Sequence, residues 1–228
     1  MNVVYLMTRN VYEWAVPSIR SLAAHNPEAR VFMLIEDDSF PYELPIPVEV
    51  INVKNQSWFG SDGVNIKNDF GGYINFLKVC YPDLLPVDKV LHLDIDAMVC
   101  DDLTPLWETD MSGKWFGMVR EYLGTTRPFG FYYYNAGVLL MNLEQMRKDG
   151  ISPKMVDYLN NTKVRWVDQD CFNYYGLTND KIVPLDVRWN ESRVTGTTPN
   201  PGIVHYCSYA DWWTKQDMPR KEILDHYR

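Results

Sequence analysis

Short, mainly apolar runs alternate with segments of helical periodicity along the first half of the chain. The apolar runs are too short for typical helices, and they predict strands at Val3–Met7, Val31–Ile35, Val48–Val53 and Lys89–Asp94. Helical spacing of apolar side chains predicts helices between them, at Val11–Ala24 and Tyr73–Leu85. Strands that are apolar on both faces occur in mostly parallel sheets covered by helices on both sides. The pattern therefore predicts an α/β protein built around such a sheet.

The second half of the chain is less regular. It offers strand patterns at Trp115–Val119, Gly137–Met141 and Ile203–Tyr206, and helical patterns near Ile151–Leu159 and Asp170–Tyr175. Residues 54–72 are rich in Asn, Ser, Gly and Asp and predict a long loop, a kind of segment that more often binds than fills space. No repeat or linker divides the 228 residues. A single domain, residues 1–228, is therefore expected.

Charge and cysteine content restrict the partners and the compartment. Twenty-two Lys and Arg oppose thirty Asp and Glu, a net charge of −8, which argues against nucleic acid as a partner. The longest uncharged stretch, Pro128–Leu143, is too short for a transmembrane segment, and the N-terminus lacks a basic leader. The cysteines at 80, 100, 171 and 207 lie far apart in apolar surroundings and predict buried free thiols. A cytoplasmic protein without a transmembrane segment is expected.

Two carboxylates interrupt a run that would otherwise be a buried strand. Asp94 and Asp96 follow Val90–Leu93, and unpaired charge in such a place costs several kcal/mol unless a cation or donors meet it. In an extended chain the two side chains would leave the same face, at the carboxyl end of a strand where open α/β sheets bind ligands. Such oxygen ligands suit Mg²⁺ or Mn²⁺ shared with a diphosphate. The alternative is a strand end whose aspartates cap the next turn.

Three other sites carry polar side chains beside apolar runs. His205 ends a second short run and is either a metal ligand or a structural histidine. Asn135 could hydrogen-bond a polyhydroxylated ligand while Gly137 allows close backbone approach, or the pair could form a turn before a core strand. Asp168 and Asp170 precede an amphipathic run, where either could be a helix N-cap with no further role.

In order and in detail these segments resemble the retaining glycosyltransferases of family 8, which include glycogenin and bacterial lipopolysaccharide galactosyltransferases. The resemblance is carried by Ser18–Leu22, Leu84–Pro86, Asp88–Asp96, Leu103–Trp107, Tyr134–Leu143, Asp168–Asp170 and His205–Cys207. It implies a GT-A fold, a Rossmann-like mostly parallel sheet flanked by helices, with a nucleotide-binding half (1–100) and an acceptor- and sugar-binding half (101–228). It also implies a UDP-sugar donor, a glycan or other hydroxyl acceptor, and Mn²⁺ or Mg²⁺ as cofactor.

The resemblance also implies roles for individual residues. The metal ligands would be Asp94, Asp96 and His205. Gln169 would lie near the anomeric carbon with Asp168 beside it as the catalytic pair, and Glu121 would lie on the acceptor side, in a loop reaching Phe131. The donor would contact Thr8, Asn10, Lys78, Asp94, Ile95, Asp96, Asn135, Ala136, Gly137, Asp168, Gln169 and His205.

The chain departs from the family pattern at three positions. Ser208 replaces a glycine, Asp211 replaces the lysine that binds the pyrophosphate, and Lys78 replaces an arginine and so gives up its bidentate fork. An acidic side chain beside a diphosphate weakens donor binding unless Lys215, Lys78 or Arg193 substitutes. These departures allow a remote branch or a neighbouring retaining GT-A family.

Two other functions fit part of the pattern. A nucleotide-sugar or carbohydrate-binding protein with impaired catalysis is the main alternative, because of the lost lysine. A nucleotidyltransferase would carry a Gly-rich phosphate loop after the first strand, where this chain has Leu6–Asn10.

Overall fold

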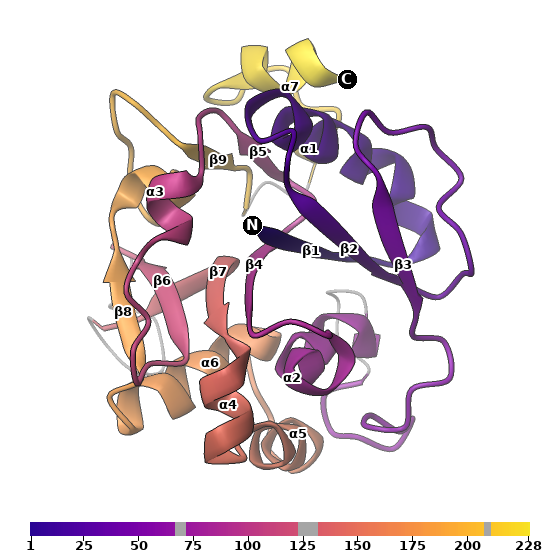
Figure 1. The fold of residues 1–228 in the computed structure, drawn as a ribbon, viewed down its shortest axis with the longest axis vertical. Helices are drawn as coiled ribbons and strands as arrows, with labels where there is room; N and C mark the ends of the chain where they lie inside the picture. The colour runs from indigo at the N-terminus through magenta and orange to yellow at the C-terminus, as the bar shows by residue number, and fades with distance from the viewer. Residues whose placement is uncertain (67–71, 123–131, 208–210) are drawn as a thin grey trace.

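A seven-stranded sheet forms the centre of the protein in the computed structural model, which describes residues 1–66, 72–122, 132–207 and 211–228 (Figure 1). Its strand order is β3-β2-β1-β4-β7-β6-β8, and a separate two-stranded sheet pairs β5 with β9. The strands are β1 (Asn2–Leu6), β2 (Arg30–Ile35), β3 (Val48–Asn52), β4 (Lys89–Leu93), β5 (Ala97–Val99), β6 (Phe116–Arg120), β7 (Tyr134–Asn142), β8 (Ile182–Leu185) and β9 (Ile203–His205). Four of the six neighbouring pairs in the large sheet are parallel, and both pairings of β7 are antiparallel.

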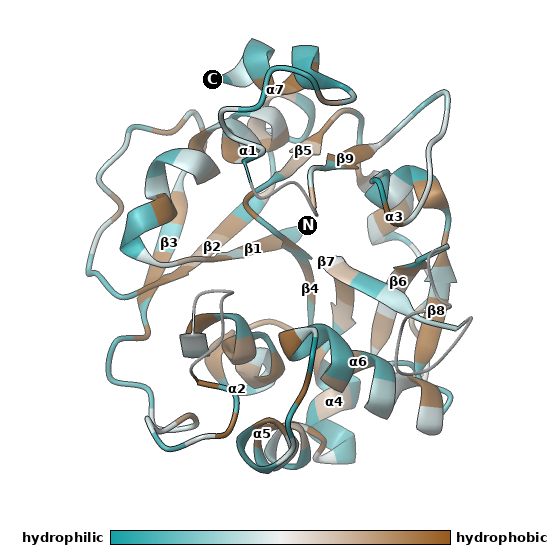
Figure 2. Cartoon of the chain, turned by 180° about the vertical axis from the view of Figure 1, so that it is seen from behind, coloured by the Kyte–Doolittle hydropathy of each residue, from teal (hydrophilic) through white to brown (hydrophobic). Residues whose placement is uncertain are grey.

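The helices cover both faces of this sheet. The α-helices are α1 (Tyr12–His25), α2 (Tyr81–Leu84), α3 (Thr104–Trp107), α4 (Leu143–Asp149), α5 (Ser152–Asn161), α6 (Val167–Thr178) and α7 (Lys221–Tyr227). The 3₁₀ helices are η1 (Arg9–Val11), η2 (Gly72–Cys80) and η4 (Val187–Asn190). Strands β1, β2 and β4 are predominantly hydrophobic in colour in Figure 2, as burial on both faces requires.

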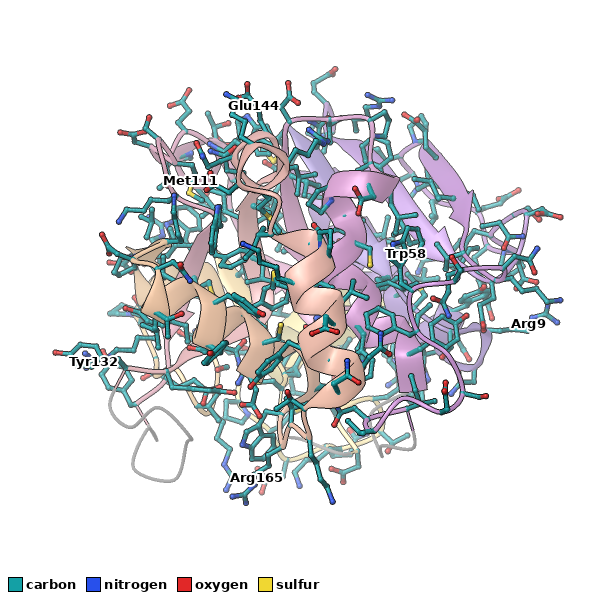
Figure 3. All side chains as sticks on the ribbon, turned by 90° about the horizontal axis from the view of Figure 1, so that it is seen from below. Arg9, Trp58, Met111, Tyr132, Glu144 and Arg165 are labelled. Carbon is teal, nitrogen blue, oxygen red and sulfur yellow. The ribbon has the colours of Figure 1, made fainter. Side chains whose placement is uncertain are left out.

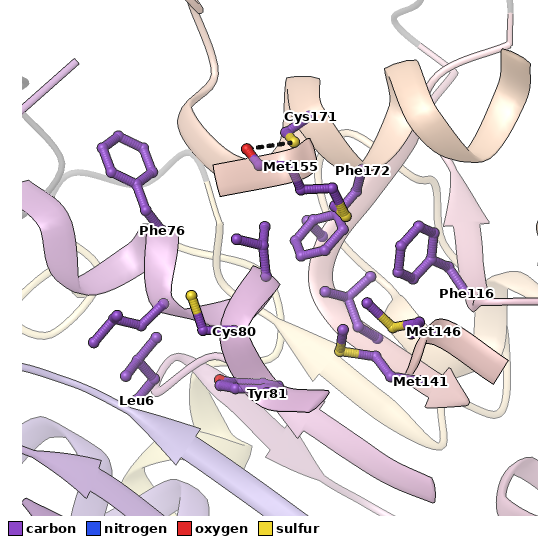
Figure 4. Close-up of a cluster of buried hydrophobic side chains, with 14 of the residues drawn as sticks. Leu6, Phe76, Cys80, Tyr81, Phe116, Met141, Met146, Met155, Cys171 and Phe172 are labelled. Atoms are coloured by element: carbon purple, nitrogen blue, oxygen red, sulfur yellow. Dashed lines mark hydrogen bonds between the residues drawn. The ribbon is translucent and has the colours of Figure 1, made fainter. Parts of the chain in front are cut away.

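Alternate residues of each central strand feed two separate apolar cores. Val4 and Leu6 of β1 pack with η2, α2, α4, α5 and α6 in one core, part of which Figure 4 shows. Val3 and Tyr5 pack with α1, α3, β5 and β9 in the other. This period-two alternation explains why a run of consecutive apolar residues can form one strand. Charged side chains such as Arg9, Glu144 and Arg165 project from the periphery instead (Figure 3).

Most predicted elements are confirmed within one or two residues, but several boundaries are not. The segment predicted as one helix over 73–85 is a nine-residue 3₁₀ helix followed by the short α2. Strand β7 begins at Tyr134, so Asn135 lies inside a strand and the alternative of a turn before that strand is wrong. Helix α6 begins three residues before Asp170, and this places Asp168 and Gln169 inside the helix.

All four cysteines are free thiols, as predicted. Cys80 and Cys171 are buried, whereas Cys100 and Cys207 are partly exposed, so the prediction of burial is wrong for those two. Within the described ranges no helix combines the length and apolar character needed to cross a bilayer.

Candidate active site

The acidic motif forms a tight turn between β4 and β5. The Asp94 amide donates to the Gly137 carbonyl oxygen at 2.8 Å, and the Ala97 amide donates to the Asp94 carbonyl oxygen at 3.0 Å. Strand β4 has already ended at Leu93, so the expectation that both aspartates share one face of an extended chain is wrong. The turn nevertheless brings both carboxylates to the carboxyl end of β4, where the sequence predicted them.

Pairing of β5 with β9 brings the imidazole of His205 to these carboxylates. Ala97 and His205 are opposite each other in the antiparallel register. His205 Nε2 lies 3.2 Å from Asp96 Oδ1 and 3.7 Å from Asp94 Oδ2. One ligand atom from each of the three residues lies within 4.8 Å of the other two. The structure thus brings together the three side chains that the family resemblance implied as metal ligands.

The bonding around Asp94 and His205 leaves one atom of each side chain directed at the point where they meet. Asp94 Oδ1 is held by Lys78 Nζ at 2.9 Å and His92 Nε2 at 2.8 Å, so Oδ2 remains toward His205. His205 Nδ1 lies 2.9 Å from Asn190 Oδ1, which fixes the ring and directs Nε2 at the carboxylates. Two carboxylate oxygens and one imidazole nitrogen fit Mn²⁺, and they leave coordination positions for other ligands.

Burial and neighbouring charges shift the pKa values of Asp94 and His205 in opposite directions. Burial alone would raise the pKa of Asp94, but Lys78 and His92 hold it well below its usual range, so the carboxylate is ionised. Burial likewise opposes protonation of His205, yet the Cys207 and Asp96 side chains raise its pKa well above the ordinary value. The triad therefore favours a positive charge at the point where the three side chains meet.

Gly137 has a use that the sequence did not reveal. A β-carbon at this position would lie 1.9 Å from His205 Cε1 and 2.6 Å from His205 Nε2. Because Gly137 has no side chain, the His205 ring can pack directly against its backbone. Any larger residue at 137 would displace the imidazole.

Two pockets meet at the acidic turn, with Asp94 and Asp96 lining both. The larger, of about 380 Å³, is lined on one side by Thr8, Asn10 and Ile95. The other, of about 300 Å³, contains the remaining predicted donor and acceptor residues, which are Lys78, Glu121, Asn135, Ala136, Gly137, Asp168, Gln169 and His205. The fold thus gathers every predicted site residue into one continuous region.

Lys78 links the acidic turn to helix α6. Its Nζ lies 2.9 Å from Asp94 Oδ1 and 3.2 Å from Asp168 Oδ2, and its side chain is 5% exposed. Burial would lower the pKa of Lys78, but the two carboxylates raise it above its ordinary value and keep the amine protonated. Burial raises the pKa of Asp168 to about 6 although Lys78 opposes the shift.

A buried amide network surrounds Glu121. Gln169 Nε2 and Asn135 Nδ2 both donate to Glu121 Oε1, at 3.1 and 3.0 Å. Gln169 Oε1 accepts from the Ala136 amide at 2.9 Å, and Asn135 Oδ1 accepts from Asn190 Nδ2 at 2.9 Å. The Gln169 side chain is thereby held at both ends of its amide. The 123–131 part of the predicted acceptor loop lies outside the described residues.

The start of α6 carries backbone strain next to the site. Val167 has a φ of 44°, a left-handed conformation that β-branched residues rarely adopt. Neither Asp168 nor Asp170 is the N-cap, which is Trp166. Asp170 instead accepts from the amides of Arg165 and Trp166, at 2.8 and 3.0 Å, and so stabilises the turn that delivers Asp168.

Sequence reasoning missed three residues that support the triad. His92 bonds Asp94, Tyr81 bonds His92, and Asn190 bonds His205. Burial lowers the pKa of His92 to about 4, so its imidazole is neutral at neutral pH. A polar residue within an apolar strand was the available signal for His92, whereas no local pattern marked Tyr81 or Asn190.

The departures from the family pattern have different structural outcomes. Ser208 lies outside the described residues. The Asp211 side chain is 61% exposed, and its Oδ1 lies 3.9 Å from Lys215 Nζ. Of the candidate substitutes for the missing lysine, Lys78 lines the pocket beside the acidic turn.

The acidic turn at the carboxyl end of β4 thus has a histidine facing it and two pockets beside it. The chain belongs to glycosyl transferase family 8, whose family model matches residues 2–217. Two solved structures share its fold. An active-site mutant of LgtC gives a TM-score of 0.75 at 21% identity, covering 100% of this chain and 95% of that one. Apo GlyE of Streptococcus pneumoniae gives 0.76 at 22% identity, covering 99% and 59%.

Curated relatives agree with this assignment. Glycosyltransferase GlyA of Streptococcus pneumoniae is 29% identical over 217 residues, which are 86% of this chain and 30% of the relative. General stress protein A of Bacillus subtilis is 23% identical over 183 residues, covering 67% and 63%. The chain therefore spans between about a third and two thirds of the length of these relatives.

Proposed function

We propose that this chain is a metal-dependent retaining glycosyltransferase that moves a hexose from UDP-glucose or UDP-galactose to a glycan or another hydroxyl acceptor. The observation that carries the proposal is the convergence of Asp94, Asp96 and His205 where two pockets meet. A nucleotide diphosphate-sugar has its charge in the middle and a neutral group at each end. A cation site between two pockets matches that distribution.

The two pockets divide the donor between the two halves of the chain. The pocket with Thr8, Asn10 and Ile95 is lined almost entirely by residues 1–100, and in the proposal it holds the uridine. The pocket with Asn135, Ala136 and Gly137 would hold the hexose, with Glu121 toward the acceptor.

Asp94, Asp96 and His205 would hold Mn²⁺, with Mg²⁺ as an alternative, because their donor atoms fit such an ion. When bound, the ion supplies Lewis-acid stabilisation of the charge that develops on the departing diphosphate. Lys78 keeps Asp94 and Asp168 ionised and close together, and Asp168 orients the hydroxyls of the sugar.

Gln169 is suited to a positioning contact at the anomeric carbon rather than to covalent catalysis. An amide is a weak nucleophile, and Gln169 Oε1 already accepts from the Ala136 amide. We therefore favour attack by the acceptor hydroxyl on the face that UDP leaves, with a donor phosphate oxygen taking the proton. This route retains the anomeric configuration without a glycosyl-enzyme intermediate.

The proposal is tested by screening UDP-sugars with Mn²⁺ for release of UDP. Asp94→Asn and Asp96→Asn are expected to abolish metal-dependent transfer while retaining the circular dichroism spectrum and the cooperative thermal transition of a folded protein. Transfer at an undiminished rate in EDTA, or by either variant, would refute the proposal.

Asp211 favours a second candidate, a nucleotide-sugar- or carbohydrate-binding protein with impaired catalysis. The sequence resemblance puts Asp211 at the position of the family's pyrophosphate-binding lysine, and its side chain is 61% exposed. Slow Mn²⁺-dependent hydrolysis of the donor without acceptor would favour the transferase. Tight donor binding with no turnover would favour the binding protein.

A further inference from the structure

A chain of buried hydrogen bonds runs from the apolar core to the acidic turn. The Tyr81 hydroxyl lies 2.9 Å from His92 Nδ1, and His92 Nε2 lies 2.8 Å from Asp94 Oδ1. Tyr81 and His92 have no exposed surface. Tyr81 lies beside Cys80 in the core shown in Figure 4. Burying two polar side chains there has a cost that an apolar pair would avoid.

The chemistry of the three groups fixes the direction of every proton in this chain. An ionised Asp94 only accepts hydrogen bonds, so His92 Nε2 carries a hydrogen and donates to Oδ1. A neutral imidazole then has its lone pair on Nδ1, which accepts from the Tyr81 hydroxyl. The His92 ring is held at both nitrogens and therefore has a single orientation.

The backbone around His92 is equally constrained. It lies in β4 opposite Val4 of β1 and Leu139 of β7, so strands flank it on both sides. Asp94 follows two residues later, at the start of the turn. The imidazole is therefore fixed by the central sheet, and its hydrogen bond holds the Asp94 carboxylate in a fixed position relative to that sheet.

We propose that His92 and Tyr81 are positioning residues that hold Asp94 Oδ1 from the protein interior and thereby direct Asp94 Oδ2 at the metal site. This inference rests on the proposed metal-dependent function, since it concerns how one ligand of that site is oriented. Lys78 holds the same oxygen from the pocket side, at 2.9 Å. With Oδ1 held twice, the carboxylate offers one oxygen in a fixed direction, which favours binding of the ion without further ordering.

Mn²⁺ binding measured directly tests the inference, by electron paramagnetic resonance of free Mn²⁺ with and without UDP. His92→Phe keeps an aromatic ring but removes both hydrogen bonds, and we expect the Mn²⁺ Kd to rise roughly 10- to 100-fold. Tyr81→Phe removes one hydroxyl and should raise the Kd roughly two- to tenfold. His92→Gln can place an amide donor near Asp94 Oδ1 and should recover part of the affinity.

Tyr5→Phe is the matched control. Tyr5 is also fully buried in the sheet, and its hydroxyl lies 3.1 Å from Ser18 Oγ in the core on the opposite face. The Tyr5→Phe variant should lose stability as Tyr81→Phe does, but its Mn²⁺ Kd should be unchanged. Excess Mn²⁺ should restore the turnover of the His92 variants, because their defect is in metal occupancy.

The possible results separate the inference from the function on which it rests. A folded His92→Phe or Tyr81→Phe variant with the wild-type Mn²⁺ Kd would overturn the inference while leaving the transferase proposal intact. If His92→Phe does not fold, Tyr81→Phe decides the question, because it removes a single oxygen atom. A wild-type protein that takes up no Mn²⁺ with UDP present would refute both proposals together.

Discussion

Adding one methyl group at Gly137 is expected to remove His205 from the proposed metal site. The new β-carbon would lie 1.9 Å from His205 Cε1, whereas carbon atoms in contact lie about 3.5 Å apart or more. The ring must therefore move by about 1.6 Å. Gly137 lies in β7 and has no positive φ, so the alanine strains no backbone dihedral and the effect is confined to this contact.

A displacement of that size exceeds what metal coordination tolerates, since ligand distances vary by only about 0.2 Å. It also separates His205 Nδ1 from Asn190 Oδ1, now at 2.9 Å. Because the proposal makes His205 a direct ligand, we expect the Mn²⁺ Kd of Gly137→Ala to rise at least about 100-fold. Overpacking of the core should lower the free energy of unfolding by about 1–3 kcal/mol.

Gly117→Ala provides the control, because Gly117 lies in the neighbouring strand β6 of the same sheet. Its β-carbon would lie 3.2 Å from Leu140 Cβ, so it also crowds the core. Both variants should unfold at lower urea concentration, but only Gly137→Ala should lose Mn²⁺ in a titration followed by electron paramagnetic resonance. Equal Mn²⁺ affinity for wild type and Gly137→Ala would show that His205 is not a ligand.

Three further changes test the charges around the site. Burial raises the pKa of Asp168 to about 6, so the folded state binds this proton more tightly than the unfolded chain does. Acidification from pH 7 to pH 4 should therefore raise the free energy of unfolding of wild type by about 2 kcal/mol relative to that of Asp168→Asn, measured by urea unfolding. Free energies of unfolding that change with pH in parallel for the two proteins would contradict this. Lys78→Met leaves the carboxylates of Asp94 and Asp168 without their shared cation and should lower the free energy of unfolding by about 3–5 kcal/mol. An unchanged midpoint of urea unfolding would argue against this pair of ion pairs. Asp211→Lys restores the family's cation and should lower the Kd of UDP roughly tenfold in calorimetry with the Mn²⁺ Kd unchanged; unchanged UDP affinity would place residue 211 away from the diphosphate.

The strands of the large sheet were predictable because burial on both faces requires a continuous apolar run, which can be recognised in the local sequence. Residues such as Val3 and Val4 face opposite cores, so the whole run must be apolar, and that composition is visible without knowing the partners. The helix expected over 73–85 shows the limit of this reasoning. Its apolar spacing is compatible with either helix type, and the hydrogen-bond pattern that selects a 3₁₀ helix is not encoded in hydrophobic period alone.

The site was predictable only where its residues are close in sequence or match a family pattern. Asp94 and Asp96 stood out as charges at the end of an apolar run. The close fit of Gly137 to His205 depends on the pairing of β5 with β9 and of β4 with β7, which joins segments far apart in the chain. Contacts of this kind produce no periodic pattern in the sequence, and the hydrogen bond between Asn190 and His205 produces none either.

The charges that line the pocket containing Lys78 and Glu121 indicate why the proposed function would depend on a metal ion. Among the described side chains that line it, Asp94, Asp96, Asp168 and Glu121 are acidic and Lys78 is the basic one beside His205. Lys78 is already shared between two of those carboxylates, so its charge is largely offset before any donor arrives. A diphosphate entering the pocket alone would meet net negative charge, and this chain has Asp211 at the position where the resemblance implies a pyrophosphate-binding lysine. A divalent cation offsets two of these charges at the point where the pockets meet, and donor binding should therefore depend on the ion more strongly here than in family members that retain the lysine.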